Sequence, residues 1–282
     1  MQKTKIEWCD ATWNPVTGCL HGCEYCYARK IAERFGGCDK LSTYGIAAKS
    51  RFKRINLESD DIKDANFETS EKKPPLNVRF DSKRQKTKVS IAPYPFDFQP
   101  TLHRHLLNQP SKWKKPKRIF VCSMADLFGG WVPEQWIEAV FDVCRQNPQH
   151  TYLFLTKNPG RYCRMANEGK LPKKSDMPYL WFGTTITNFD DEYFSSTFHN
   201  TFLSIEPIQS DFPYAKNPLC VDWVITGAET GNQKDKYVPS KESVLNIISS
   251  CYKWDVPLFM KDSLIPIVGE ENMRRQFPDF KK

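Results

Sequence analysis

The sequence contains no apolar run that approaches the roughly 20 consecutive residues needed to span a bilayer. The segment Met1–Asp10 mixes Lys, Glu, Trp and Cys, and it lacks the apolar centre of a secretory signal peptide. Internal repeats and low-complexity segments are also missing. We therefore expect a cytoplasmic protein that does not bind a membrane.

Two functional or structural classes are disfavoured by the sequence. No Gly-x-Gly-x-x-Gly fingerprint follows the early predicted strands, which disfavours a dinucleotide-binding sheet. Since the cytoplasm is reducing, the ten cysteines are better interpreted as thiols or metal ligands than as a disulfide framework. Four of them lie among apolar residues and are predicted to be structural: Cys122, Cys144, Cys220 and Cys251.

The composition is that of a globular protein. Of the 282 residues, 40% are apolar and 26% are charged, so the chain can bury a sizeable core and global disorder is excluded. Residues Lys49–Lys88 are polar, charged and proline-containing, with little apolar periodicity. We expect one domain over residues 1–282, with a polar, basic insertion at about 49–88 outside its core.

The formal net charge of +8 is unevenly distributed. It concentrates in Lys112–Arg118 and in Lys72–Lys88, the second of which contains Lys72, Lys73, Arg79, Lys83, Arg84, Lys86 and Lys88. Such runs suit an anionic partner, nucleic acid included, through phosphate contacts and release of counterions. The alternative interpretation is a solvated loop, because charge alone does not specify a partner.

Short apolar runs alternate with helical patterns along the rest of the chain. The helices are predicted at Tyr27–Phe35, Pro133–Gln146 and Lys241–Tyr252, each from an apolar stripe at helical spacing. In Tyr27–Phe35 the stripe consists of Tyr27, Ile31 and Phe35. Buried strands are predicted at Val89–Ala92, Ile119–Ser123, Tyr152–Thr156, Leu180–Thr185, Thr201–Ile205, Trp223–Thr226 and Leu258–Lys261.

This alternation predicts βαβ units and a parallel sheet. The chain has room for about six to eight such units. The predicted fold class is therefore α/β, with a full or partial TIM-type (β/α) barrel favoured over an open doubly wound sheet.

The strongest motif is a group of three closely spaced cysteines, Cys19, Cys23 and Cys26. Three thiolates at this spacing can enclose one compact metal site, either zinc or an iron–sulfur cluster. A four-iron cluster held by three cysteines leaves one iron open to a small molecule. The alternative is a zinc site in which His21, Cys9 or Cys38 supplies the fourth ligand.

The pattern Cys-x3-Cys-x-aromatic-Cys resembles that of the radical S-adenosylmethionine (SAM) enzymes, and Cys19, Cys23, Tyr25 and Cys26 match it at every position. The resemblance implies a [4Fe–4S] cluster on the three cysteines, SAM bound to the open iron, and an electron donor. It also implies that Tyr25 lies beside the adenine. One-electron reduction would then cleave SAM to a 5′-deoxyadenosyl radical, which abstracts a hydrogen atom.

A closer likeness covers nearly the whole chain. It is carried by Thr4-Lys5-Ile6-Glu7-Trp8, Thr12-Trp13-Asn14-Pro15-Val16-Thr17-Gly18-Cys19, Met124-Ala125-Asp126-Leu127-Phe128, Leu155-Thr156-Lys157, Ser204-Ile205-Glu206-Pro207 and Trp223-Val224-Ile225-Thr226-Gly227. These segments resemble a phage-associated family of unassigned activity. That likeness implies a class of chemistry but names no substrate.

Polar residues at the carboxyl ends of the predicted strands are further candidates, because those ends carry the reactive groups of a parallel barrel. Radical SAM enzymes usually have a Gly-Gly-Glu element that receives the methionine amino group of SAM, and this sequence lacks it. Ser123 to Asp126 follow a predicted strand and could bind SAM in its place, mainly through backbone carbonyls. Lys157 could bind the SAM carboxylate or a substrate phosphate, and Glu206 could accept hydrogen bonds from ribose hydroxyls. For each residue the alternative is a charge that caps a loop or pairs with a neighbour.

Three functions compete. The first is a radical SAM enzyme that modifies or repairs a nucleic acid or nucleotide; spore photoproduct lyases show that this chemistry reaches DNA. The second is a radical SAM enzyme acting on a small metabolite or a peptide. The third is a non-catalytic nucleic-acid-binding protein whose metal only stabilises the N-terminal loop. The sequence does not indicate an oligomeric state.

Overall fold

The structure, a computed structural model, describes residues 4–36, 52–55, 66–69, 76–81, 85–231 and 236–280. The chain divides into two compact units. Unit 1 contains Met1–Ala11, Lys117–Ile119 and His150–Lys282; unit 2 contains Thr12–Pro116 and Phe120–Gln149. That the whole chain forms one domain stays a prediction.

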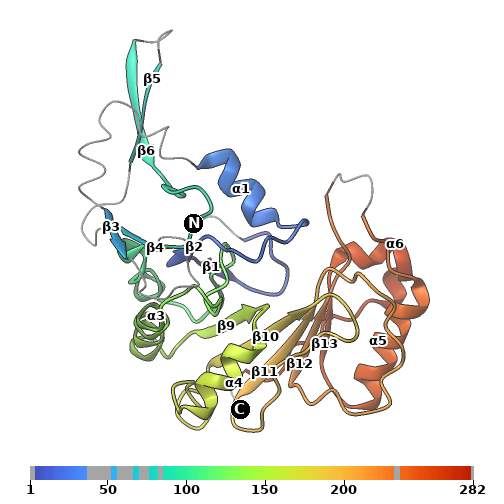
Figure 1. The fold of residues 1–282 in the computed structure, drawn as a ribbon. Helices are drawn as coiled ribbons and strands as arrows, with labels where there is room; N and C mark the ends of the chain where they lie inside the picture. Colours follow the sequence, from blue (N-terminus) through green and yellow to red (C-terminus); the bar gives the residue numbers. More distant parts are fainter. Residues whose placement is uncertain are drawn as a thin grey trace. The chain divides into compact units, whose positions relative to one another are not determined.

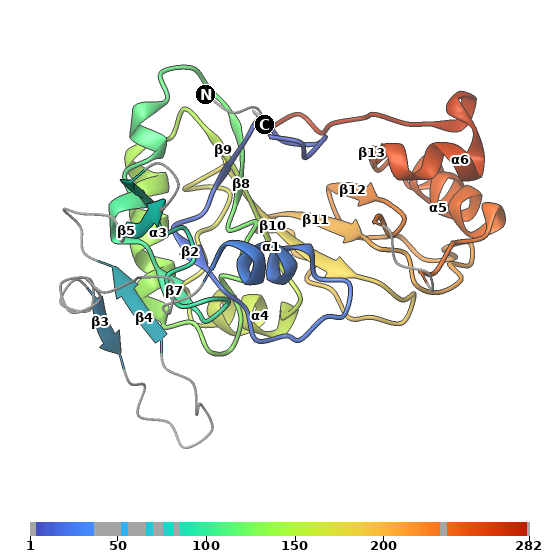
Figure 2. The same ribbon diagram turned by 90° about the horizontal axis from the view of Figure 1, so that it is seen from above.

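The main sheet has seven strands, with the spatial order β1-β8-β9-β10-β11-β12-β13. The pairs from β9 through β13 are all parallel, and β10 to β13 lie side by side in Figures 1 and 2. The predicted α/β class with a parallel sheet is thus confirmed. The strands are β1 Ala11–Trp13, β8 Arg118–Val121, β9 Thr151–Thr156, β10 Leu180–Ile186, β11 Asn200–Ile205, β12 Trp223–Thr226 and β13 Leu258–Met260.

In unit 1, α4 (Pro159–Asn167) lies between β9 and β10, and α5 (Lys241–Lys253) lies between β12 and β13. No helix lies between β10 and β11 or between β11 and β12, where every residue is described, so the predicted alternation of strands with helices holds only in part. Every residue of β11 and β12 is buried, as expected when both faces of a parallel sheet are covered. Helix α5 begins at Ser240, whose side chain accepts a hydrogen bond from the backbone N–H of Ser243 at 3.1 Å. The other helices of unit 1 are α6 (Ile265–Val268), η4 (Asp262–Leu264) and η5 (Glu270–Asn272).

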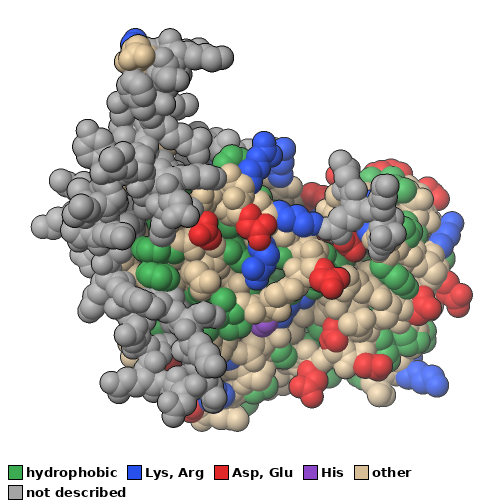
Figure 3. Space-filling view, turned by 45° about the horizontal axis from the view of Figure 1, so that its top comes forward, with side chains coloured by type: hydrophobic (Ala, Val, Ile, Leu, Met, Phe, Trp, Pro, Cys, Tyr) green, Lys and Arg blue, Asp and Glu red, His purple; other side chains and the backbone are tan. Residues whose placement is uncertain are grey.

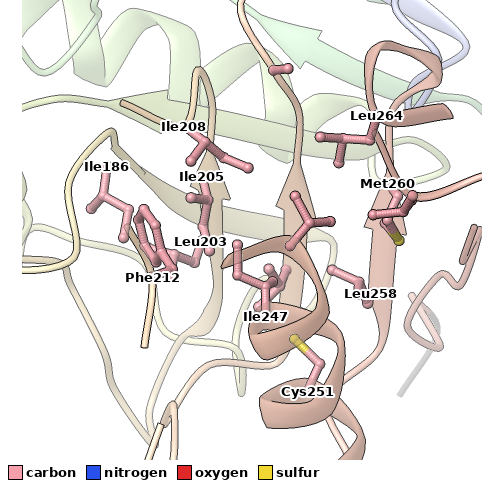
Figure 4. Close-up of a cluster of buried hydrophobic side chains, with 14 of the residues drawn as sticks. Ile186, Leu203, Ile205, Ile208, Phe212, Ile247, Cys251, Leu258, Met260 and Leu264 are labelled. Atoms are coloured by element: carbon pink, nitrogen blue, oxygen red, sulfur yellow. The ribbon is translucent and has the colours of Figure 1, made fainter. Parts of the chain in front are cut away.

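The core of unit 1 lies between α5 and the strands at the end of the sheet. Ile247 and Cys251 on α5 pack with Leu203 on β11 and Leu258 on β13, and these side chains converge in Figure 4. Burying such side chains stabilises the fold by roughly 2 kcal/mol each. This packing fixes the carboxyl ends of β11, β12 and β13 relative to one another.

Unit 2 is built around short strands from distant parts of the chain. A four-stranded sheet has the order β2-β7-β4-β3, and β5 pairs with β6 as an antiparallel hairpin. The strands are β2 Val16–Thr17, β3 Phe52–Ile55, β4 Asn66–Thr69, β5 Leu76–Asp81, β6 Lys86–Ile91 and β7 Thr101–Leu102. The helices are α1 (Tyr27–Phe35), α3 (Glu134–Gln146), η2 (Arg104–Leu106) and η3 (Pro110–Lys112).

Two described residues of the predicted insertion at 49–88 do not lie outside the core. Glu68 and Thr69 on β4 are buried, although the surrounding sequence is polar. Glu68 can be buried because Arg104 and Trp136 donate hydrogen bonds to its carboxylate. The segment predicted as a buried strand at Val89–Ala92 falls, up to Ile91, in the hairpin strand β6. Ile91 is exposed there, whereas Ala92, beyond the strand, is buried.

Helix α1 has the predicted bounds, but its apolar stripe does not face the core. Tyr27, Ile31 and Phe35 are exposed, whereas Ala28 and Ala32 are buried. The alanines allow the helix to pack closely against Phe98 and Met124. The larger side chains therefore lie on the outer side.

The structural cysteines follow the prediction except at one position. Cys122, Cys144 and Cys251 are buried, and burial raises the pKa of the Cys122 and Cys251 thiols to about 12. Cys220 is exposed, so its prediction as a buried residue was wrong. Among the residues that the structure describes, no helix combines the length and the apolar character needed to cross a membrane.

Candidate metal centre

The three motif cysteines lie in unit 2, on the loop that leads into α1. Cys26 is the N-cap residue of α1, and its sulfur accepts a hydrogen bond from the backbone N–H of Arg29 at 3.3 Å. Cys19, Cys23 and Cys26 are all half-buried. Sulfur atoms that are partly exposed and accept backbone N–H groups suit metal-bound thiolates, because those hydrogen bonds offset negative charge.

Glycine is required where the loop begins. Gly18 has a φ of +89°, and an added Cβ would lie 2.2 Å from the backbone oxygen of Gln99. The close approach lets the backbone N–H of Gly18 bond to the carbonyl of Met124 at 2.9 Å, and that of Cys19 bond to the carbonyl of Phe98 at 3.1 Å. The sequence thus fixes the position of Cys19 through its backbone.

The cysteines influence one another electrostatically. Burial is the main reason why the pKa of the Cys19 thiol is raised to about 12, and a hydrogen bond from the backbone of His21 opposes this. Negative charge on Asp126, Cys23 or Cys26 acts in the same direction as burial, so these groups lie near the Cys19 sulfur. A bound metal would favour the deprotonated form of Cys19 instead, since a coordinating thiol loses its proton.

The predicted residues Ser123 and Asp126 lie beside this loop, within the same unit. The carbonyl of Ser123 accepts a hydrogen bond from the hydroxyl of Tyr27 at 2.7 Å. Oδ2 of Asp126 lies 2.7 Å from Nε2 of His21, and Oδ1 accepts the backbone N–H of Phe128 at 2.9 Å. Tyr25, which lies between Cys23 and Cys26 in the sequence, is half-buried. The structure therefore brings Ser123 and Asp126 together with the cysteine loop.

Lys157 and Glu206 belong to unit 1, where they follow β9 and β11 at the carboxyl edge of the parallel strands. Glu206 forms an ion pair with Lys261, which follows β13. Gly227 lies under the Lys261 side chain, since a Cβ there would be 3.1 Å from Lys261 Cδ. This pairing corresponds to the alternative interpretation for Glu206, a charge paired with a neighbour.

Several residues that support the loop were not singled out from the sequence. Arg29 donates to the carbonyl of Cys19 at 3.4 Å, and its guanidinium lies 5.1 Å from the centre of the Phe98 ring. Asn14 accepts hydrogen bonds from the Ser123 hydroxyl and from the Met124 backbone N–H. Asn14 lies in one of the segments that carry the closer likeness, which is the only signal that pointed to it.

The zinc alternative can be compared with these positions. Nε2 of His21 faces Asp126, Cys9 is buried in unit 1, and Cys38 lies outside the described residues. Within the described part of the chain, no group of three or more His, Cys, Asp or Glu side chains is already spaced to hold a metal ion. Both the zinc hypothesis and the iron–sulfur hypothesis stay predictions.

The structure describes all of Lys112–Arg118 but only part of Lys72–Lys88. Lys112, Lys114 and Lys115 are exposed, whereas Arg118 forms an ion pair with Asp10. In the Lys72–Lys88 run, Lys72, Lys73, Lys83 and Arg84 lie outside the described residues. On the face shown in Figure 3, the basic and acidic side chains of the described residues are interspersed. The charges on that face therefore do not indicate where an anionic partner would bind.

Comparison with known proteins gives one finding. A family described as "Protein of unknown function (DUF5131)" matches residues 3–264. No curated protein and no solved structure shows a significant match.

Proposed function

Because this chain belongs to the DUF5131 family, which has no known function, we propose its activity from the site itself: it is a [4Fe–4S]- and SAM-dependent radical enzyme. The observation that carries the proposal is the cysteine loop. Three half-buried thiols lie on one segment, and backbone N–H groups donate to two of their sulfurs. Three thiolates without a fourth cysteine in the motif leave one iron of a cubane open.

The chain would hold the cofactors as follows. Cys19, Cys23 and Cys26 ligate the cluster, and Tyr25 lies beside the adenine of SAM. When bound, the cluster supplies one electron that cleaves SAM to methionine and a 5′-deoxyadenosyl radical, which takes a hydrogen atom from the substrate. The protein's part is to orient SAM and to exclude water from the radical.

The fold supports this proposal in its coarse features. Parallel strands with candidate side chains at their carboxyl ends are the arrangement that a (β/α) barrel uses for catalysis, and we propose a full or partial TIM-type barrel of about six to eight units. Lys157 and Glu206 remain the candidates for SAM or substrate contacts in unit 1. Glu206 could accept hydrogen bonds from ribose hydroxyls through Oε2, since its ion pair with Lys261 uses Oε1.

For the substrate we propose a nucleic acid or nucleotide, handled in the cytoplasm. Support comes from the charge of +8 and from the exposed lysines at 112, 114 and 115. An external reductant would supply the electron.

The test begins with the full chain reconstituted anaerobically with iron and sulfide. Iron and sulfide are quantified, and the protein is then reduced with dithionite in the presence of SAM and assayed for 5′-deoxyadenosine. Cys23→Ala is compared with Cys163→Ala, which removes an exposed cysteine of α4 outside the motif. We expect four irons per chain and SAM cleavage in the wild type and in Cys163→Ala, with both lost in Cys23→Ala.

Two results would reject the proposal. One is a protein that takes up a single zinc ion and no sulfide, which would favour the non-catalytic nucleic-acid-binding protein. The other is a cluster that forms but never cleaves SAM, which would make the cluster structural. Retention of full iron content in Cys23→Ala would remove that residue from the ligands.

A further inference from the structure

We propose that Asp126 is a positioning residue that holds the cysteine loop in its metal-binding shape through His21 and places a fixed negative charge beside the cluster. This inference rests on the proposed function, because it concerns the same cysteines. It differs from the expectation that Asp126 contacts SAM directly. The contacts of the described residues support it in four steps.

First, both carboxylate oxygens of Asp126 are used by the chain itself. The Asp126 side chain is only 7% exposed. Its Oδ1 accepts the backbone N–H of Phe128 at 2.9 Å, and its Oδ2 lies 2.7 Å from Nε2 of His21. A buried carboxylate is tolerated when such partners satisfy it, and removing one partner leaves an uncompensated charge. Asp126 is therefore built into the loop's support.

Second, His21 is the part of the loop that Asp126 can hold. It lies between Cys19 and Cys23, two residues from each. Its ring contacts Asp126 at one nitrogen and packs edge-on against Trp131, with the ring centres 4.8 Å apart. Two contacts of different kinds fix the orientation of the imidazole. Since His21 is only two residues from each cysteine, fixing it restricts both.

Third, the residues around Asp126 anchor the loop at both ends as well. Near the start, the N–H of Gly18 bonds to the carbonyl of Met124, and beyond the end the hydroxyl of Tyr27 bonds to the carbonyl of Ser123. His21 on Asp126 is the anchor in the middle. Gly18, His21 and Tyr27 lie before, within and after the run of three cysteines, and their partners Met124, Asp126 and Ser123 all lie on the short segment 123–126. This segment therefore acts as a scaffold for the cysteine loop.

Fourth, the charge of Asp126 acts on the cysteines. The Asp126 carboxylate lies beside the cysteine loop, because its Oδ2 is 2.7 Å from Nε2 of His21, which is two residues from both Cys19 and Cys23. Reduction of a cluster adds negative charge to it, and a carboxylate at this position opposes that addition. Asp126 is thus expected to lower the midpoint potential of a cluster held there.

The experiment separates the positioning role from the charge. Asp126→Asn keeps the shape and removes the charge; its oxygen can still accept from the Phe128 N–H, and its NH2 can donate to Nε2 of His21 in the tautomer protonated at Nδ1. His21→Ala removes the middle anchor, and His21→Gln restores a side chain able to bond to Asp126. Asp142→Asn on α3 is the matched control, because that aspartate is exposed and lies in the same unit. Each variant is reconstituted anaerobically. Iron and sulfide content, the electron paramagnetic resonance spectrum after dithionite reduction, and the midpoint potential are then measured without SAM.

We expect His21→Ala to lose most of its cluster, His21→Gln to recover at least half of the wild-type content, and Asp126→Asn to shift the midpoint potential to a more positive value. Asp142→Asn should match the wild type in every measurement. Wild-type content and spectrum in His21→Ala, or an unchanged potential in Asp126→Asn, would overturn the inference.

Failure of the inference can be distinguished from failure of the proposed function. If the wild type assembles no cluster, the proposed function itself fails, and the inference fails with it. If the wild type assembles a cluster and the variants behave as it does, only the inference fails. Circular dichroism identifies a variant that does not fold, and should Asp126→Asn be one, the comparison of His21→Ala with His21→Gln decides.

Discussion

The indole nitrogen of Trp136 on α3 donates a hydrogen bond to Oε1 of Glu68 on β4, at 2.8 Å. The second oxygen of Glu68 accepts from Arg104, whose Nη2 lies 2.7 Å away. The Glu68 side chain is only 6% exposed, so these donors take the place of water. One buried carboxylate thereby connects β4, α3 and η2 in unit 2.

Replacing Glu68 with Ala should lower the free energy of unfolding by about 3 kcal/mol, because it leaves the Arg104 charge and the Trp136 N–H without their partner. Glu68→Gln should cost less, since it keeps an acceptor for Trp136. Glu138→Ala on the exposed face of α3 is the control and should change stability by no more than about 0.5 kcal/mol. Urea unfolding followed by circular dichroism measures all three, and equal costs at positions 68 and 138 would show that the buried contacts contribute nothing.

Glu68 also shows where the sequence stops being informative. Unit 1 could be predicted because strands covered on both faces must be continuous apolar runs, and β12 has the predicted bounds, Trp223–Thr226. The helices α1 and α3 of unit 2 were also predicted, but its four-stranded sheet could not be, because β2 and β7 have two residues each, too few to show a period. A glutamate in a polar segment looks solvated until its partners are known, and those partners lie 36 and 68 residues away.

The candidate metal centre follows the same division. The spacing of the cysteines is local, so the loop could be found from the sequence alone. The contact of His21 with Asp126 joins residues 105 apart, and no local pattern specifies it. The stripe of Tyr27, Ile31 and Phe35 has a clear helical period, and the period predicted the helix. It does not show whether the small or the large residues face the core.

A second prediction concerns pH. His103 is buried, Oγ1 of Thr17 lies 2.8 Å from its Nε2, and burial lowers the pKa of its ring to about 3, with a smaller contribution from His105. Below its ordinary pKa of about 6.5, the unfolded chain therefore takes up a proton that the folded chain does not. Folding stability is lost as the pH falls from about 6.5 towards 3, by up to about 1.4 kcal/mol per pH unit from this residue.

Unfolding in urea at pH 7.5, 5.5 and 4.5 measures this effect. His103→Gln has no titrating ring, so its stability should fall less steeply over that range, even if it starts lower at pH 7.5. A wild-type pH slope in His103→Gln would mean that the folded chain protonates this ring as readily as the unfolded chain does.

A third prediction uses two glycines of the cysteine loop as a matched pair. Both have positive φ, +89° at Gly18 and +72° at Gly22, but a Cβ at Gly22 would meet nothing within 4 Å. Gly22→Ala should therefore cost only the strain of its backbone conformation, about 1 kcal/mol. Gly18→Ala adds a collision with the backbone of Gln99 and should cost about 3 kcal/mol or more.

Iron content after anaerobic reconstitution measures how each of the two glycine substitutions affects metal uptake. Gly18→Ala displaces the backbone that positions Cys19, so we expect it to lose most of its iron, whereas Gly22→Ala keeps it. Equal iron content in the two variants would show that the entry to the loop does not control metal uptake.

The last prediction concerns nucleic acid. Lys112, Lys114 and Lys115 are exposed, so replacing all three with Gln should weaken binding of a single-stranded DNA oligonucleotide. Each lysine that contacts a phosphate should reduce the slope of log affinity against log salt by about 0.7. Fluorescence anisotropy over a range of sodium chloride concentrations measures the slope, and neutralising Lys72–Lys88 should flatten it in the same way.

Arg118 in the same run provides the control, because its charge is already used within the fold. It pairs with Asp10 and lies 4.2 Å from the ring centre of Phe277, and it holds the pKa of the Asp10 carboxyl below its usual range. Arg118→Gln should therefore leave the salt slope unchanged and lower the stability by about 1 kcal/mol or less, since the pair is partly exposed. If Arg118→Gln flattens the slope while the triple lysine variant does not, the anionic partner lies along Arg118, and the lysines are a solvated loop.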